Sequence, residues 1–243
     1  MKVLGIIPAR YNSTRFPGKP LIDLKGKTMI QRVYEGALKC EDIDTLIVAT
    51  DDERILATVE NFGGKAILTK ADHPSGTDRC GEVAQKYQGY DVIINIQGDE
   101  PLVNPSQLAQ LIRVFKSNEV EIATLATKNV SKEDIENPNR IKVIRDVNQN
   151  ALYFSRSPIP NIYHAKTAAL NEFAFLKHIG LYAFRTQTLL QLITLTPSAI
   201  EQIESLEQLR WMYYNFKIRV VETEIETPNI DTPEDVKKVV DLL

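Results

Sequence analysis

The chain has 243 residues and contains little cysteine, no long apolar run and no marked excess of charge of either sign. Its two cysteines, Cys40 and Cys80, indicate a reducing compartment, and we expect both to be bystanders without a chemical role. Apolar runs such as 92–94 are far shorter than the ~20 residues that cross a bilayer. The apolar start of the chain is also too short for a signal peptide. These absences predict a cytoplasmic protein with no membrane partner.

The charge balance argues against a nucleic-acid partner. Lysine and arginine number 29 against 32 aspartates and glutamates, which gives a formal charge of -3, whereas domains that bind duplexes usually carry a basic excess. Apolar residues make up 43% and charged residues 25%, as in ordinary globular domains, which excludes a disordered chain or a coiled coil. A chain of this length buries enough surface to fold without a metal or a disulfide.

Several ligand-binding signatures are missing as well. No G-x-G-x-x-G occurs, and the Walker-like Gly26-Lys27-Thr28 has Leu21 where the first glycine of a P-loop would stand. The three histidines lack the spacing of metal ligands. Asp42-Ile43-Asp44 matches the D-x-D pattern of many glycosyltransferases, but it precedes a strand, so we interpret it as a turn.

The pattern of apolar residues alternates between strand and helix periods. We expect strands at 3–8, 45–50, 65–68 and 91–97, and helices at 29–38, 52–62 and 75–87, the first capped by Thr28, the second ended by Gly63-Gly64 and the third capped by Ser75. In the second half we expect helices at 105–116, 205–215 and 233–243, strands at 122–126, 178–185 and 218–222, and a hairpin at 141–145 and 151–155. Strands that are apolar on both faces predict an α/β fold, a mostly parallel sheet in a three-layer, Rossmann-like domain with an inserted β-rich lobe.

In such sheets ligands bind beyond the carboxyl ends of the strands, and a basic loop follows the first strand there. Residues 9–20 contain three cations, two hydroxyls and no acid: Arg10, Arg15, Lys19, Ser13 and Thr14. The loop is longer than the ~2–6 residues that usually join a strand to a helix. It predicts a site for a polyphosphate, although a solvated surface loop is the plainer alternative.

Two aspartates are candidates for metal binding. Asp99 follows the apolar strand 91–97, where Gly98 permits close approach of a ligand and a carboxylate could share Mg²⁺ with substrate phosphates. Turn or capping chemistry is the alternative at this position. Asp231 precedes the last helix, and Thr232 with Asp235 also fits a simple capping arrangement.

Eight blocks, in order along nearly the whole chain, resemble the 3-deoxy-manno-octulosonate (Kdo) cytidylyltransferase family. They are residues 7–21, 49–52, 75–79, 95–101, 151–160, 178–182, 203–210 and 230–235. The resemblance implies a nucleotide-diphospho-sugar-transferase fold over 1–243, with a nucleotide-binding half at about 1–126 and a half for sugar binding and dimerisation at about 127–243. It also implies the reaction CTP + Kdo = CMP-Kdo + diphosphate, dependence on Mg²⁺, a homodimer, and a role in lipopolysaccharide or capsule synthesis.

The resemblance also assigns residues. The nucleotide would contact Ala9, Arg10, Ser13, Thr14, Arg15, Lys19, Asp51, Ser75, Gly76, Arg79 and Gln97. The sugar would contact Gln97, Arg156, His178, Glu207 and Gln208. Mg²⁺ would bind Asp99 and Asp231, and the catalytic residues would be Arg10, Lys19 and Asp99. These roles suit two anionic reactants, and the planar guanidinium of Arg156 can bind a sugar carboxylate in bidentate fashion.

Three points stay open at this stage. The acidic sugar could be 8-amino-Kdo or a sialic-type acid, and a non-catalytic nucleotide-sugar binding protein is an alternative from another class. No residue is singled out as the general base, and metal-lowered acidity of the sugar hydroxyl is one option. Family members often have a glycine shortly before the Asp231 motif. Here Asn229 is the residue that we expect to adopt the left-handed conformation in its place.

Overall fold

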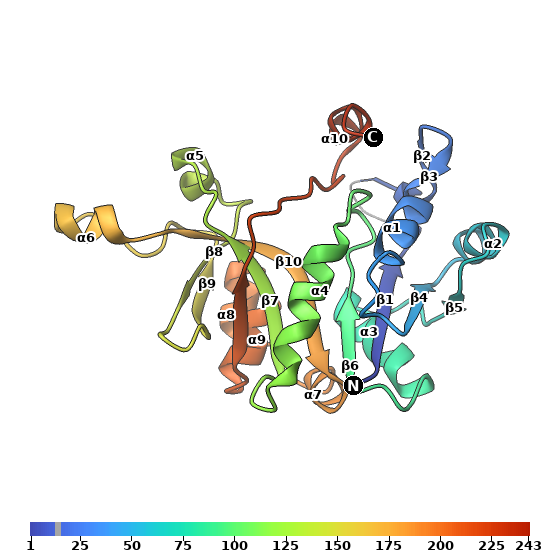
Figure 1. Cartoon of the computed structure of the whole chain (residues 1–243), viewed down its shortest axis with the longest axis horizontal. Helices are drawn as coiled ribbons and strands as arrows, with labels where there is room; N and C mark the ends of the chain where they lie inside the picture. Colours follow the sequence, from blue (N-terminus) through green and yellow to red (C-terminus); the bar gives the residue numbers. More distant parts are fainter. Residues whose placement is uncertain (13–15) are drawn as a thin grey trace. The chain divides into compact units, whose positions relative to one another are not determined.

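The computed structural model describes residues 1–12 and 16–243, which form two compact units (Figure 1). Unit 1 contains Met1–Arg113, Leu181–Ile193 and Thr227–Leu243. Unit 2 contains Val114–Gly180 and Thr194–Glu226. The chain therefore passes between the units several times, and a C-terminal segment returns to the unit that holds the N-terminus.

The core of unit 1 is a mostly parallel sheet. Its parallel strands lie in the order β6 (Val92–Asn95), β1 (Val3–Ala9), β4 (Thr45–Thr50) and β5 (Ala66–Leu68). The end of β10 (Leu176–Arg185) pairs antiparallel with β6, so that Tyr182 lies opposite Asn95. Nearly every residue of the three central strands is buried, which is expected for strands covered on both faces. The α/β fold with a mostly parallel sheet is thus confirmed.

The helices of unit 1 begin where the sequence predicts. Thr28, Asp52 and Ser75 each accept a hydrogen bond from a backbone N–H in the first turn of their helix. The helices are α1 (Met29–Ala37), α2 (Glu53–Asn61), α3 (Gly76–Lys86), α4 (Pro105–Arg113), α7 (Thr186–Leu192) and α10 (Pro233–Val240). Helix α1 packs with α4, and α3 packs with α7 (Figure 1). Helix α7 was not expected from the sequence.

A small second core lies beside the sheet of unit 1. Leu24 from the hairpin of β2 (Asp23–Leu24) and β3 (Lys27–Thr28) packs with Ile230 and with Val239 of α10. Phe16, which lies within the basic loop, packs against the same cluster. The short helix η1 (Lys19–Leu21) leads into this hairpin. The cluster therefore connects the end of the basic loop to the segment that carries Asp231.

Unit 2 contains the β-rich part of the chain. Strands β7 (Ile122–Thr127) and β11 (Ile218–Glu222) are parallel, and β8 (Lys142–Arg145) and β9 (Ala151–Ser155) form the predicted hairpin. The carboxylate of Asp146 closes that hairpin by accepting hydrogen bonds from the backbone of Asn148 and Asn150. The predicted helix at 205–215 is shorter, because Ser205 has a φ of 51° and ends α8 (Ala199–Glu204) before α9 (Gln208–Tyr213) begins.

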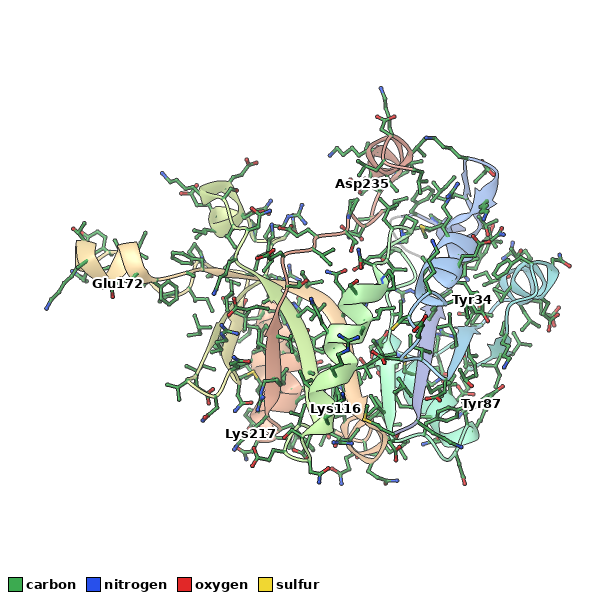
Figure 2. All side chains as sticks on the ribbon, viewed as in Figure 1. Tyr34, Tyr87, Lys116, Glu172, Lys217 and Asp235 are labelled. Carbon is green, nitrogen blue, oxygen red and sulfur yellow. The ribbon has the colours of Figure 1, made fainter. Side chains whose placement is uncertain are left out.

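Helices α5 (Lys132–Glu136), α6 (Thr167–Glu172) and α8 of unit 2 were not expected, whereas η2 (Val114–Lys116) is the end of the helix predicted at 105–116. Figure 2 labels Glu172 at the end of α6, whose surroundings carry exposed apolar side chains. Tyr163 is 84% exposed and Ile162 51% exposed. Among the described residues, every helix is too short or too polar to span a bilayer. Both cysteines are buried, and neither forms a disulfide.

Candidate active site

Unit 1 contains a pocket of about 240 Å³ at the carboxyl ends of β1 and β6. It is lined by Pro8, Ala9, Arg10, Lys19, Pro20, His73, Pro74, Ser75, Gly76, Arg79, Gln97, Gly98 and Asp99. A Cβ atom on Gly98 would lie 2.7 Å from the carbonyl oxygen of Pro8, so only glycine lets the ends of the two strands approach this closely. The pocket is therefore built from three segments that are distant in the chain, residues 8–20, 73–79 and 97–99.

The basic loop supplies the cations of the pocket. The Lys19 ammonium donates to the Asp99 carboxylate at 2.8 Å and to the Ile230 carbonyl at 2.8 Å. Arg10 lines the same pocket and is exposed to an entering ligand. The predicted contacts of Ser13, Thr14 and Arg15 lie outside the described residues. Two cations at one side of the pocket provide the positive charge that a polyphosphate requires.

A side chain of α2 contacts the start of the basic loop. The backbone N–H of Gly18, where φ is 73°, donates to the Tyr11 carbonyl at 2.8 Å and closes the loop. The Arg54 guanidinium lies 3.4 Å from the centre of the Tyr11 ring and is fixed there by the carboxylate of Asp52. A cation over an aromatic face is attractive. The loop that carries Arg10 and Lys19 is thus attached to the next strand–helix unit.

Asp99 and the segment before α10 lie side by side. The Ile230 N–H donates to the Asp99 carbonyl at 2.9 Å, and the Asn229 side chain donates to the Asp231 carboxylate at 2.8 Å. The predicted left-handed backbone of Asn229 is wrong, because the described residues with positive φ do not include it; its side chain orients Asp231 instead. Asp235, labelled in Figure 2, accepts from the backbone of Asp231 and Thr232 and caps α10.

The donor set here suits a hard cation. Asp99 offers a carboxylate beside the Ile230 carbonyl, and both already face one positive charge, the Lys19 ammonium. Among the described residues no group of three or more His, Cys, Asp or Glu side chains could hold a metal ion without further ligands. One or two carboxylates completed by substrate phosphates is the arrangement that Mg²⁺ commonly adopts. The residues therefore fit the predicted ion.

Glu100 is the most perturbed acid beside the pocket. It is 7% exposed, and burial together with the neighbouring Asp99 charge raises its pKa to about 8. Its Oε2 atom accepts a hydrogen bond from the Thr227 hydroxyl at 3.1 Å. Glu100 is therefore largely protonated near neutral pH and acts as an uncharged link to the segment that leads to Asp231. The sequence analysis assigned no role to this side chain.

The opposite wall of the pocket comes from the start of α3. Ser75 caps the helix, and its hydroxyl also donates to Asp78 at 2.6 Å. The Arg79 guanidinium is buried, donates to the Thr69 hydroxyl at 2.5 Å and lies 3.5 Å from the Asp51 carboxylate. Because Asp51 does not line the pocket itself, it contacts the site only through Arg79. Contacts within the protein thus hold the Ser75 and Arg79 side chains in place at this wall.

The residues predicted to bind the sugar, apart from Gln97, belong to unit 2. The Arg156 guanidinium donates to three backbone carbonyls, those of Pro138, Glu204 and Ser205. Lys142 is 1% exposed, and its ammonium donates to the Arg156 carbonyl at 2.6 Å. The backbone N–H of Arg156 donates to the Glu204 carboxylate at 2.9 Å. Arg156 is thus held at its backbone and along its side chain.

His178 lies on β10 within unit 2. Its Nε2 atom is 2.9 Å from the Thr124 hydroxyl, and the Phe154 ring packs edge-on at 5.0 Å between ring centres. Burial lowers the pKa of His178 to about 3, so the imidazole is neutral at physiological pH. Glu207 immediately precedes α9 and is partly exposed, whereas Gln208 in the first turn is buried.

Besides Glu100, three more side chains had no role predicted from the sequence. His73 lines the pocket and contacts Glu82 of α3. Asn95 is buried at the end of β6, and its Oδ1 atom has no hydrogen-bond partner among the described residues. Lys142 is a buried lysine in an otherwise ordinary strand pattern. The only available signal was a polar residue at a position where the pattern calls for an apolar one, as at Asn95 and Lys142.

Known proteins are similar to this chain over most or all of its length. The family model described as cytidylyltransferase matches residues 4–219. The 3-deoxy-manno-octulosonate cytidylyltransferase of Parabacteroides distasonis is 52% identical over 100% of this chain and 98% of its own, and that of Syntrophobacter fumaroxidans is 48% identical over 100% and 97%. A solved CMP:2-keto-3-deoxy-manno-octonic acid synthetase complexed with CTP is 44% identical with a TM-score of 0.93, covering 100% of this chain and 98% of that one. On this similarity over the full length, the chain belongs to the 3-deoxy-manno-octulosonate cytidylyltransferase family.

Proposed function

We propose that this chain is a nucleotidyltransferase that joins CMP from CTP to Kdo and releases diphosphate. The observation that carries the proposal is the pocket of unit 1, which Arg10 lines and in which Lys19 binds Asp99, in a protein 52% identical to a named Kdo cytidylyltransferase. In the reaction a hydroxyl oxygen of the sugar bonds to the α-phosphorus and loses its proton. The bond from the α-phosphorus to the bridging oxygen breaks, and the electron pair leaves with diphosphate.

The pocket residues divide the work on the nucleotide. Arg10 and Lys19 hold phosphate oxygens, and Ser75, Gly76 and Arg79 form the wall for the nucleoside. When bound at Asp99 and Asp231, Mg²⁺ supplies further positive charge to the phosphates. The protein then acts mainly by positioning the reactants and by stabilising negative charge that develops in the transition state.

Most of the proposed sugar contacts come from unit 2. We assign Arg156 to the sugar carboxylate and His178, Glu207 and Gln208 to its hydroxyls, with Gln97 from the nucleotide pocket. Three of the five N–H groups of Arg156 bind carbonyls, so a carboxylate would take the others or displace one carbonyl. The neutral imidazole of His178 can exchange hydrogen bonds with a hydroxyl without adding charge.

A panel of acidic sugars tests the function directly. The purified protein, CTP and Mg²⁺ are incubated with Kdo, 8-amino-Kdo or a sialic acid, and the product mass and diphosphate release are measured. We expect CMP-Kdo, and no diphosphate when a chelator removes Mg²⁺. Product from 8-amino-Kdo alone would correct the sugar, whereas binding of CTP without any product would favour the non-catalytic alternative. Asp241→Asn, an exposed change at the end of α10, serves as a control with unchanged turnover.

A homodimer is the proposed assembly. The segment around α6 exposes Ile162, Tyr163 and Phe173, the last of them 41% exposed. Exposed apolar side chains gathered on one segment commonly mark a protein interface. Sedimentation equilibrium tests the assembly, and Tyr163→Glu should shift it toward the monomer. The cytoplasmic location stays a prediction from the composition and the short apolar runs, and the role in lipopolysaccharide or capsule synthesis stays a prediction from the sequence resemblance.

A further inference from the structure

Arg79 is a buried cation at the nucleotide pocket, and its side chain is held at two points. The residue lines the pocket and is 3% exposed. Its Nη1 atom donates to the Thr69 hydroxyl at 2.5 Å, and its Nη2 atom lies 3.5 Å from the Asp51 carboxylate. Asp51 directly follows β4 and Thr69 directly follows β5. The two partners therefore reach Arg79 from the ends of neighbouring strands.

The Thr69 hydroxyl can bind Arg79 in one way only. A guanidinium carries N–H donors and no acceptor, so the Thr69 oxygen accepts the hydrogen bond. The hydroxyl proton then goes to another acceptor, and the Thr50 carbonyl accepts it at 3.1 Å. The backbone N–H of Thr69 donates to the same carbonyl at 2.8 Å. A continuous chain of hydrogen bonds therefore runs from the Arg79 guanidinium through Thr69 to the backbone of β4.

This chain of hydrogen bonds restricts a long side chain. An unrestrained arginine samples many rotamers, and the cost of ordering it weakens the binding of any ligand that depends on its position. At Arg79 the protein's own groups supply that order. Thr69 is itself 8% exposed, so water competes little for the two hydrogen bonds of its hydroxyl.

We propose that Thr69 is a positioning residue for CTP binding, whose hydroxyl holds the Arg79 side chain in its place at the nucleotide pocket. The inference rests on the proposed function, in which Ser75, Gly76 and Arg79 form the wall for the nucleoside. Without the Thr69 hydroxyl the charge of Asp51 still attracts Arg79. We therefore expect the guanidinium to turn toward that carboxylate and to leave its place in the wall.

The KM for CTP, compared with the KM for Kdo, tests the proposal. Thr69→Val replaces the hydroxyl with a methyl group of similar size. We expect it to raise the KM for CTP about 10-fold, as on the loss of one hydrogen bond to a charged group, and to leave the KM for Kdo unchanged. Thr69→Ser keeps the hydroxyl and should restore most of the wild-type value. Thr45→Val is the matched control, because that hydroxyl is bound by Tyr90 at 2.8 Å at the opposite end of β4.

A double-mutant cycle shows whether Thr69 acts through Arg79. Calorimetry measures the Kd for CTP, with Mg²⁺ and without sugar, in wild type, Thr69→Val, Arg79→Met and the double variant. We expect Thr69→Val to weaken CTP binding in the wild type and to have no further effect beside Arg79→Met. An equal effect in both backgrounds would overturn the proposal. Should Arg79→Met not fold, Arg79→Lys takes its place in the cycle, since it keeps a charge for Asp51 without the fork of N–H donors.

The outcomes separate this inference from the proposed function. A wild type that binds CTP but forms no CMP product refutes the function, while the calorimetric comparison still tests Thr69. A wild type that binds no CTP refutes both. Unchanged CTP affinity in Thr69→Val overturns the inference even if the melting temperature falls, since the role of Thr69 would then be structural only. Equal rises in the KM values for CTP and Kdo would overturn it as well, because Arg79 belongs to the nucleotide wall.

Discussion

The two units use buried positive charge in different ways. In unit 1 the Lys19 ammonium lies at the wall of a pocket and faces a carboxylate and one carbonyl. In unit 2 the Lys142 ammonium faces three backbone carbonyls, those of Asn137, Arg140 and Arg156, away from solvent. The first cation is placed where a ligand can reach it, and the second is used to hold the chain.

This difference predicts which property each cation controls. A cation at a pocket wall stabilises bound phosphates and the charge that develops on them, so its loss affects turnover. A buried cation that satisfies backbone carbonyls stabilises the fold, because those carbonyls have no water to replace it. Arg156 combines the two cases, since it contacts three carbonyls and is also the proposed partner of the sugar carboxylate.

The largest expected effect is the loss of turnover in Lys19→Met. Removal of one positioned cation from a transition state of this kind costs about 10²–10³-fold in kcat, and we expect at least that in diphosphate release. The melting temperature should change little. Lys27→Met, which removes a hairpin lysine paired with Glu35, is the control and should turn over normally. A loss below tenfold in Lys19→Met would place the phosphates elsewhere.

The next effect is on stability and belongs to unit 2. Lys142→Met removes the buried donor shared by the carbonyls of Asn137, Arg140 and Arg156, and we expect the free energy of unfolding to fall by about 3 kcal/mol. Chemical denaturation measures it, with Lys132→Met on the exposed face of α5 as the control. A change of less than about 1 kcal/mol, within the range of surface substitutions, would mean that water reaches these carbonyls.

The smallest effect concerns pH and His178. Its folded pKa, about 3, lies below the ordinary value of 6.5, so the unfolded chain binds a proton that the folded chain does not. The stability contribution is complete above pH 6.5 and is lost as the pH falls from 6.5 toward 3. Between pH 7.5 and pH 5, His178→Asn should therefore lose roughly 1–2 kcal/mol less stability than wild type in denaturation.

Comparison of the two proteins at each pH isolates this imidazole, because His73 and His164 are present in both. Equal losses of stability in wild type and His178→Asn would show that the imidazole can take up its proton in the folded protein. In that case His178 would be open to solvent, and the contrast between a pocket in unit 1 and a closed interior in unit 2 would weaken.

The degree to which sequence predicted structure also differs between the units. In unit 1, strands of uniform apolar character and caps at Thr28 and Ser75 were recognisable, because caps and hydrophobic periods are local signals. In unit 2 the helix expected at 205–215 begins only at Gln208, because Ser205 has a left-handed backbone that ends α8. No local sequence pattern predicts that conformation. Short helices such as α5 and α8 are held by capping boxes and by tertiary contacts more than by a long apolar period.

In the candidate site, too, some features were predictable from the sequence and others were not. Arg10, Lys19 and Asp99 were predicted because each follows a strand that was already recognisable, and the ends of parallel strands meet at one edge of a sheet. The partners of those side chains were not predictable. The contact of Lys19 with Ile230 joins residues 211 positions apart, and nothing in the local sequence indicates it.

The sequence by itself therefore determined the fold class, the family and the loops that form the nucleotide pocket. These properties depend on residue order, hydrophobic period and charge within short segments. Only the tertiary structure decided that Lys19 lies between Asp99 and Ile230, that Arg156 binds the carbonyls of Pro138, Glu204 and Ser205, and that His73 contacts Glu82. Such pairings depend on distances and burial between remote segments, which exist only once the chain has folded.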